Sequence, residues 1–261
     1  MNRTFAPLRG PAVVPRGGGE PALILVAHGS RDPRSAANAA AVRDRIAAAR
    51  PDVLVRLAFL DLNAPSVDQV VDAVAAQGCS HAIVVPLLLG SAFHARVDLP
   101  GLLDAARRRH PLLDLVQADV LGPDPRLITA LCARITEATT GYAPGRIGIA
   151  VAAVGSSRTG ANERTAEIAV AVARRTGLLT ETCFATSEPT VSAATERLRA
   201  RGAEHIVVAP WFLAPGLLTD RLRATAPGLV HTPALGAHPA LTEVVWDRYD
   251  TALGAEWELS A

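Results

Sequence analysis

Two histidines and one aspartate are the side chains in this sequence best suited to metal chemistry. They are His28, Asp61 and His94, and each ends or follows an apolar run with the pattern of a buried strand. In a parallel sheet the carboxyl ends of the strands lie at one edge, where such folds bind ligands. Two imidazoles and a carboxylate at that edge would suit a divalent first-row metal with open coordination positions. The alternative is that these are three unrelated loop residues. The elements expected around them help to distinguish this alternative from a metal site.

Hydroxyl and arginine side chains near the same edge could bind an anionic group. Helix N-termini attract anions, and the arginine guanidinium forms paired hydrogen bonds with carboxylates. The candidates for substrate binding are Ser30, Arg31, Arg34, Ser91, Arg96, Ser156, Ser157 and Arg158. For any single arginine of this set, a solvated surface position is the competing interpretation.

Strands and helices are expected to alternate along the first half of the chain. Residues 22–27 (ALILVA) form the continuous apolar run of a strand buried on both faces. Further strands are expected near 53–60, 82–89 and 113–118, and helices near 35–50, 67–77, 98–109 and 125–138. This alternation indicates βαβ units and a parallel sheet.

The second half of the chain repeats the pattern of the first. Strands are expected near 147–153, 180–185, 205–212 and 229–231, and helices near 161–176, 191–201, 217–226 and 241–253. The segments GCSHAIVVP (78–86) and GAEHIVVAP (202–210) match at an offset of 124 residues. We interpret the chain as a tandem duplication, with a flexible tail over 1–20, a first domain over 21–140 and a degenerate second domain over 146–254.

The duplication allows the two halves to be compared residue by residue. His81 and His205 correspond, which favours a scaffold role for both. The three candidate metal ligands correspond instead to apolar residues, Val154, Ala185 and Leu218. A polar residue kept in one copy only is a better candidate for chemistry, so the comparison favours a metal site in the first half.

Composition limits the partners and cofactors. With 26 basic and 25 acidic residues the net charge is +1, so no nucleic-acid partner is expected. No apolar run is long enough to span a membrane, and the first 20 residues lack the apolar region of a signal peptide, so a cytoplasmic protein is expected. Three scattered cysteines without a CxxC pair argue against a disulfide scaffold or an iron–sulfur cluster. The missing P-loop motif predicts independence of ATP.

Three motifs resemble those of the class II tetrapyrrole chelatases, specifically the sirohydrochlorin chelatases. They are VAHGSRDP (26–33), AFLD with a following Pro-Ser (58–66), and VPLLLGSAFH with a following Asp-Leu-Pro (85–100). His28, Asp61 and His94 are separated by 33 residues each, as expected for that family. The resemblance covers 22–135 with high specificity and continues weakly to 249, as in the long form of the family. One departure is Asp61, where the family more usually carries the longer Glu.

The resemblance implies a fold and a reaction. The fold would be two Rossmann-like or flavodoxin-like α/β domains with an active-site cleft between them, forming a monomer with internal pseudo-twofold symmetry. The reaction would be insertion of a divalent metal, Fe²⁺ rather than Co²⁺ or Ni²⁺, into sirohydrochlorin, without a cofactor beyond the substrate metal. His28 and His94 would be the catalytic pair of ligand and base, with Asp61 as a third metal ligand. The product would lead to sirohaem or cobalamin.

Three alternatives stay open at this point. The first is a cobaltochelatase of cobalamin biosynthesis. The second is a carrier of metal or tetrapyrrole without turnover. The third is a histidine phosphatase, because Ala27-His28-Gly29 faintly resembles an Arg-His-Gly motif, although Arg31 follows the histidine rather than preceding it.

Overall fold

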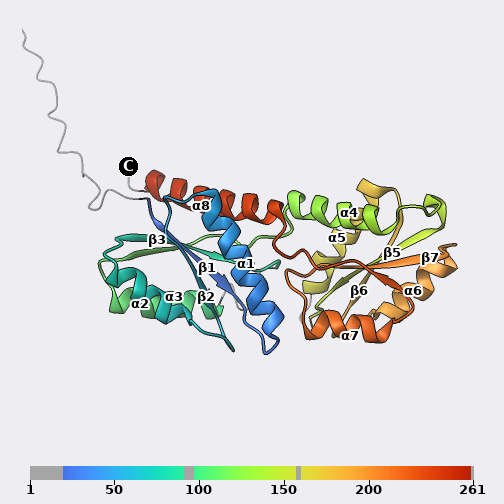
Figure 1. Cartoon of the computed structure of the whole chain (residues 1–261), viewed down its shortest axis with the longest axis horizontal. Helices are drawn as coiled ribbons and strands as arrows, with labels where there is room; N and C mark the ends of the chain where they lie inside the picture. Colours follow the sequence, from blue (N-terminus) through green and yellow to red (C-terminus); the bar gives the residue numbers. More distant parts are fainter. Residues whose placement is uncertain (1–19, 91–96, 157–159, 260–261) are drawn as a thin grey trace, which may run out of the picture.

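Two α/β units follow one another along the chain (Figure 1). The computed structural model describes residues 20–90, 97–156 and 160–259 of the 261 residues. The first sheet has the strand order β2-β1-β3-β4 and the second has β6-β5-β7-β8, with every pairing parallel. The shared topology confirms the predicted pair of parallel-sheet units. In the described ranges no helix is both long and apolar enough to cross a bilayer.

The first unit places its strands close to where the apolar runs predict them. They are β1 (Ala22–Ala27), β2 (Val55–Phe59), β3 (His81–Pro86) and β4 (Asp114–Gln117). The helices in this part of the chain are α1 (Pro33–Ala49), α2 (Val67–Ala76), α3 (Leu99–Arg109) and α4 (Pro125–Ala138). Side chains cap several helix starts, as at Ser66, whose hydroxyl accepts from the amide of Gln69 while the Gln69 side chain accepts from the amide of Ser66.

The second unit has the same order of elements. Its strands are β5 (Ile147–Ala153), β6 (Leu179–Phe184), β7 (His205–Pro210) and β8 (Val230–His231). Its helices are α5 (Ala161–Thr176), α6 (Val191–Ala200), α7 (Leu217–Thr225) and α8 (Pro239–Leu259), preceded by the short 3₁₀ helix η2 (Pro144–Arg146). Helix α8 continues through Gly254, so it is longer than the segment 241–253 that the sequence predicts.

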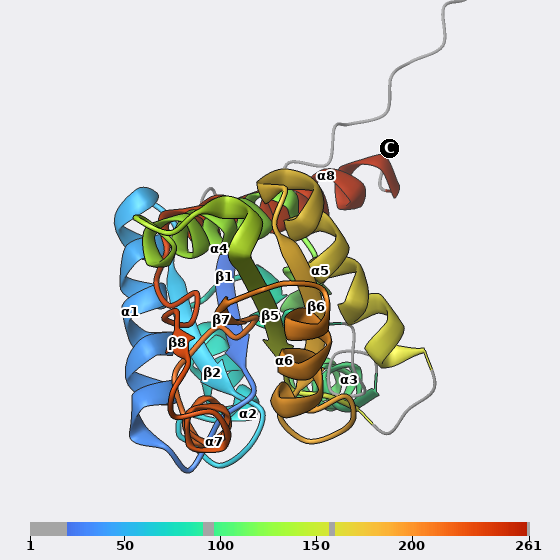
Figure 2. The ribbon, with the colours of Figure 1, turned by 90° about the vertical axis from the view of Figure 1, so that its right-hand side faces the viewer.

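The last helix of each unit packs on the other unit. Helix α4 contacts α5 and β7 of the second unit, whereas α8 contacts α1 and β3 of the first. Figure 1 shows α8 above the first sheet and α4 above the second, and Figure 2 shows α4 over β5 from the side. The ranges 21–140 and 146–254 divide the sequence at the duplication, but the packing crosses that division.

Each sheet has one face toward a core of its own and one toward a core that both units share. In β1 the alternation of side chains turns Ile24 and Val26 toward α2 and α3, and Leu23 and Leu25 toward the shared core. Both faces are dry, which explains the uninterrupted apolar run. The shared core also contains residues of α4, α5 and α8, so the exchanged helices hold the two units together.

Helix α8 is anchored to the first unit by polar contacts as well. The hydroxyl of Tyr249, a fully buried residue, donates to the carbonyl of Pro21 at 2.7 Å. The guanidinium of Arg50, at the end of α1, donates to both carboxylate oxygens of Asp250 at 2.6 Å and lies 4.3 Å from the ring centroid of Trp246. These contacts fix α8 along α1.

Candidate active site

His28 and Asp61 lie side by side at the carboxyl edge of the first sheet. Strands β1 and β2 pair through Ala27 and Phe59, and just beyond them the amide of Asp61 donates to the carbonyl of His28 at 3.1 Å. Both residues are exposed. The backbone therefore brings together two of the three residues predicted to bind metal.

The third predicted ligand, His94, lies outside the described residues. So do Ser91, Arg96, Ser157 and Arg158, and their predicted roles stay predictions. Strand β3, which precedes the segment 91–96, ends at the same edge, because the amide of Leu87 donates to the carbonyl of Val26 at 2.8 Å. Within the described ranges no group of three His, Cys, Asp or Glu residues is placed to hold a metal ion, so the predicted set depends on His94.

A close backbone contact connects the turns after β1 and β2. Gly29 has a φ of +95°, and a Cβ at this position would lie 1.8 Å from the carbonyl oxygen of Asp61. The amide of Ser30 donates to the side-chain oxygen of Asn63 at 2.7 Å. Sequence reasoning missed Asn63, although asparagine in a turn commonly bonds nearby backbone. Gly29 and Asn63 together fix the position of the two candidate ligands.

The carboxylate of Asp61 accepts a hydrogen bond within its own turn. One of its oxygens accepts from the amide of Leu62 at 2.7 Å, and Leu62 has a left-handed φ of 64°. This left-handed backbone conformation is uncommon for a residue with a side chain. The hydrogen bond from the Leu62 amide to the Asp61 carboxylate stabilises it. The exposed carboxylate remains accessible from the solvent side.

Ser30 makes a side-chain hydrogen bond within the protein, whereas Arg31 makes none to the described residues. The hydroxyl of Ser30 accepts from the amide of Asp32 at 3.1 Å and so takes part in the turn before α1. Arg31 is exposed, and no hydrogen bond or ion pair joins it to the described part of the chain. Arg31 is therefore the better placed of the two for an anionic ligand.

Arg34 forms ion pairs with two carboxylates. Its Nε and one terminal nitrogen donate to Asp32 at 3.0 and 2.6 Å, and its other terminal nitrogen donates to Asp220 at 3.2 Å. Hydrogen bonds from Arg34 are the main cause that lowers the pKa of Asp32 and of Asp220 below the ordinary value, and these bonds raise the pKa of Arg34 in turn. The geometry gives Arg34 partners within the protein, in competition with its predicted role toward substrate.

In the second unit, an asparagine side chain again bonds the serine amide after β5, although this asparagine belongs to α5 and not to the turn after the second strand. The amide of Ser156 donates to the side-chain oxygen of Asn162 at 2.8 Å, and the amide nitrogen of the Asn162 side chain donates to the carbonyl of Ser156 at 3.0 Å. Val154 stands where the first unit has His28, and 46% of it is exposed. The second unit thus keeps a serine amide bonded by asparagine without the imidazole.

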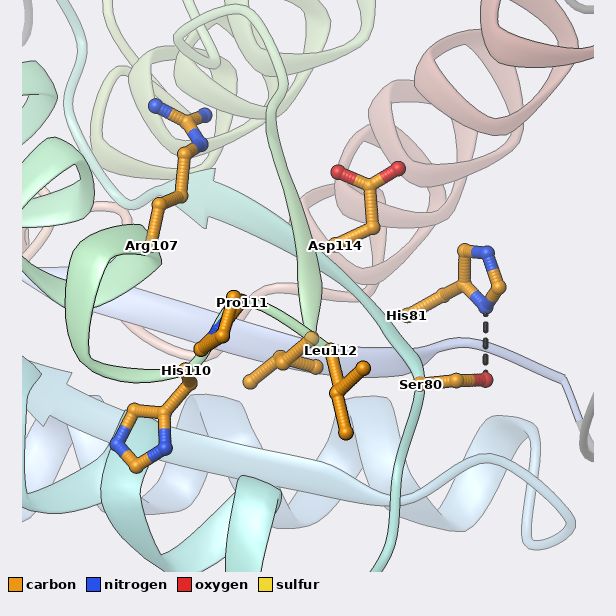
Figure 3. A pocket seen from close by; sticks show the side chains of 8 residues that line it. Ser80, His81, Arg107, His110, Pro111, Leu112 and Asp114 are labelled. Carbon is orange, nitrogen blue, oxygen red and sulfur yellow. Dashed lines mark hydrogen bonds between the residues drawn. The ribbon is translucent and has the colours of Figure 1, made fainter.

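Two cavities lie away from the residues considered so far. One, of about 480 Å³, opens at the amino end of β3 and β4, and Figure 3 shows Arg107 and His110 at its rim pointing in different directions. The other, of about 160 Å³, lies between α7 and β8 and is lined in part by Arg223 and His231. The first is at the wrong edge of the sheet for the predicted site, and its polar side chains do not converge.

The comparisons with known proteins concern both halves of the chain. The CbiX family model matches residues 22–138 and again residues 148–252. A sirohydrochlorin cobaltochelatase of Priestia megaterium is 26% identical over 255 residues, covering 91% of this chain and 82% of that protein. A sirohydrochlorin ferrochelatase of the same species is 26% identical over 245 residues, covering 90% and 91%.

Solved structures have the same fold. The structure described as SirB from Bacillus subtilis with Fe³⁺ aligns with a TM-score of 0.76 at 24% identity, covering 91% of this chain and 97% of that one. The structure of CbiX described as the terminal enzyme of sirohaem biosynthesis in denitrifying bacteria aligns with a TM-score of 0.67 at 22% identity, covering 88% and 99%. Since the family model matches both halves and most of the chain, this protein belongs to the CbiX family.

Proposed function

We propose that this protein inserts a divalent metal ion into sirohydrochlorin, with Fe²⁺ as the preferred metal. The observation that carries the proposal is the contact between the turns of His28 and Asp61, two exposed residues whose side chains are of types that bind metals, at the edge of a parallel sheet where such folds bind ligands. Membership of the CbiX family supports it, since relatives are named as sirohydrochlorin chelatases.

Two tasks fall to the residues of the site during insertion. The macrocycle must lose two pyrrole N–H protons as the metal enters, and a neutral imidazole can accept a proton near pH 7 or bind the metal. We assign these tasks to His28 and His94, with Asp61 supporting the metal. Because Asp61 is fixed through its turn, we expect it to hold the metal before transfer rather than to follow it into the ring.

The carboxylates of sirohydrochlorin need cationic or hydrogen-bonding partners around this edge. Arg31 is the described residue best suited to them, because its guanidinium is exposed and unpaired among the described residues. Ser30 and Ser156 would contribute their hydroxyls, because their amides already donate to Asn63 and Asn162. The remaining predicted contacts are Ser91, Arg96, Ser157 and Arg158. We expect the macrocycle to bind in a cleft between the two units.

Other parts of the proposal come from the sequence. We infer a lyase that needs no ATP and no cofactor beyond the substrate metal, working as a monomer in the cytoplasm. The second candidate function is cobalt insertion, because the cobaltochelatase and the ferrochelatase of P. megaterium are equally identical to this chain, at 26%. Similarity alone therefore does not choose the metal.

Parallel insertion assays test the proposal. Sirohydrochlorin is incubated without oxygen with Fe²⁺, Co²⁺ or Ni²⁺, and the absorbance change is followed under multiple-turnover conditions. We expect turnover with Fe²⁺ to be fastest, and a single stoichiometric turnover would indicate a carrier instead.

Histidine variants test the assignment of the site. His28→Ala and His94→Ala should each abolish insertion without unfolding the protein. His205→Ala is the matched control, because this histidine occurs in both copies and its ring packs on that of Tyr142 with centroids 4.4 Å apart. It should lower the melting temperature and leave insertion intact. Normal turnover by His28→Ala would refute the assignment.

A further inference from the structure

An ion pair connects the two units next to the proposed site. Arg34, in the first turn of α1, donates through both terminal nitrogens to the carboxylate of Asp220, in the first turn of α7. Asp32 holds the same guanidinium from the other side, and only 6% of Asp32 is exposed. The buried cap of α1 thus orients Arg34 toward the second unit.

Two further contacts lie beside this ion pair. The side-chain nitrogen of Asn38 donates to the carbonyl of Leu213 at 3.2 Å. Arg34 and Asn38 are four residues apart, so they share one face of α1. A Cβ on Gly216 would lie 3.8 Å from the carboxylate of Asp32, so the start of α7 abuts the start of α1. This face of α1 therefore contacts the segment 213–220 through several groups.

The tripeptide Asp-Pro-Arg, which begins α1 as residues 32–34, makes a similar connection at the start of α4. Asp124-Pro125-Arg126 begins α4, with Arg126 donating from its backbone amide and its Nε to Asp124 at 2.9 Å. Arg126 then reaches Asp247 of α8 at 3.0 Å. The sequence Asp-Pro-Arg is thus used twice to connect a capped helix start to an aspartate of another element.

The second unit has no counterpart of Arg34. Counted from the helix start, Gly160 has the N-cap place of Asp32, with a φ of 76° and without a side-chain cap, and Asn162 has the place of Arg34. Among the described residues the Arg34–Asp220 connection is therefore present on the α1 side of the molecule only.

We propose that Arg34 is a positioning residue which, through Asp220, sets the spacing of the two units at the carboxyl edge of the sheets. At the start of α5 the described residues carry no such ion pair, and α5 contacts α4 farther along the helix, so at the carboxyl edge the described tie lies on the α1 side. The inference rests on the proposed function, because the spacing matters for a flat macrocycle bound between the units. In this role Arg34 acts through Asp220 and does not contact sirohydrochlorin.

Asp220→Asn is the main test variant, because it removes the charge and leaves the Asp32–Arg34 cap intact. Asp250→Asn is the matched control, since it removes the partner of Arg50 at the opposite end of α1. We measure KM for sirohydrochlorin, kcat, and amide hydrogen exchange of residues 213–220. Asp220→Asn should raise KM about two- to five-fold, the range that an exposed ion pair supports, with kcat nearly unchanged. Exchange should accelerate, and Asp250→Asn should change neither.

Further variants separate positioning from direct substrate binding. If Arg34 acts through Asp220, the Arg34→Ala and Asp220→Asn effects on KM should not add in the double variant, and Asp220→Glu should restore KM. A raised KM in Arg34→Ala with normal KM and exchange in Asp220→Asn would overturn the proposal in favour of substrate contact. Unchanged values in both would overturn it outright. If the wild type inserts no metal, the proposed function fails, and hydrogen exchange alone still decides whether the pair holds the units together.

Discussion

Two of the hydrogen bonds of Asp61 bear on its proposed role in metal binding. Its amide donates to His28, and its carboxylate accepts from the amide of Leu62. An Asn at this position can still accept from Leu62 through its side-chain oxygen, whereas it carries no charge for a metal. The turn and the metal site can therefore be separated by substitution.

Asp61→Asn should raise the metal concentration for half-maximal insertion by about 10–100-fold, the usual scale for a lost supporting group, and leave the melting temperature nearly unchanged. Asp61→Glu should stay active, and its insertion rates with Fe²⁺, Co²⁺ and Ni²⁺ show whether the longer arm changes the order of metal preference. A wild-type metal requirement in Asp61→Asn would mean that the carboxylate serves the turn alone.

Gly29 and Gly78 provide a matched pair for the contact between the two turns. Both have positive φ, +95° and +81°, but a Cβ on Gly78 meets nothing within 4 Å, whereas one on Gly29 meets the carbonyl of Asp61 at 1.8 Å. Gly78→Ala should lower the free energy of unfolding by about 1–2 kcal/mol from backbone strain alone. Gly29→Ala should cost clearly more and impair insertion. Equal losses in denaturant titrations would contradict the close contact.

The sequence singles out candidate residues for the site, but it does not predict the residues that contact them. The apolar counterparts Val154, Ala185 and Leu218 singled out the three candidate ligands, because duplication supplies its own comparison. Asn63 and the pairing of Arg34 with Asp220 were not predicted. Contacts between residues 33 and 186 positions apart depend on how the elements pack, which a periodic pattern does not contain.

At the scale of the elements, strands and helices were predicted to within a few residues, since buried parallel strands and capped helices leave strong local signals. The exchange of α4 and α8 was not predicted. An amphipathic helix shows that it needs an apolar partner but not which sheet supplies it, so both helices fit either unit by pattern alone.

Tyr249 makes the attachment of α8 sensitive to alkaline pH. Burial raises the pKa of Tyr249 to about 12 from an ordinary value of 10.0. The folded state therefore favours the protonated hydroxyl, and this stabilisation is complete below pH 10 and is lost as the pH rises toward 12. Tyr249→Phe should lose about 1 kcal/mol at neutral pH with its hydrogen bond to Pro21, and its stability should fall less between pH 10 and 12.

Tyr142→Phe is the control for this experiment, since Tyr142 is the other tyrosine of the chain and is 41% exposed. Its unfolding free energy should follow the wild type over the same pH range. Parallel curves for Tyr249→Phe and wild type would show that the hydroxyl of Tyr249 does not hold α8.

At the scale of the whole molecule, the exchanged helices make each unit dependent on the other. A fragment of residues 20–140 keeps α1 and α4 but lacks α8, so the face of β1 and β3 that carries Leu23, Leu25 and Val85 would lose a large part of its cover. We expect this fragment and residues 144–259 to be unfolded or aggregated separately and to form a folded complex when produced together. Circular dichroism and size-exclusion chromatography test this, and two cooperatively folding fragments would contradict it.

The packing of α8 on the first unit affects how the protein folds during its synthesis. The ribosome releases β1 and β3 early, whereas α8, which helps to cover one face of them, is synthesised after all the other described elements. Until then α1 covers that face only in part, and newly made apolar strands with a partly open face are prone to aggregate or to recruit chaperones. A chain that terminates before residue 239 would therefore be defective at its beginning, in the sheet that carries His28 and Asp61, rather than at its end.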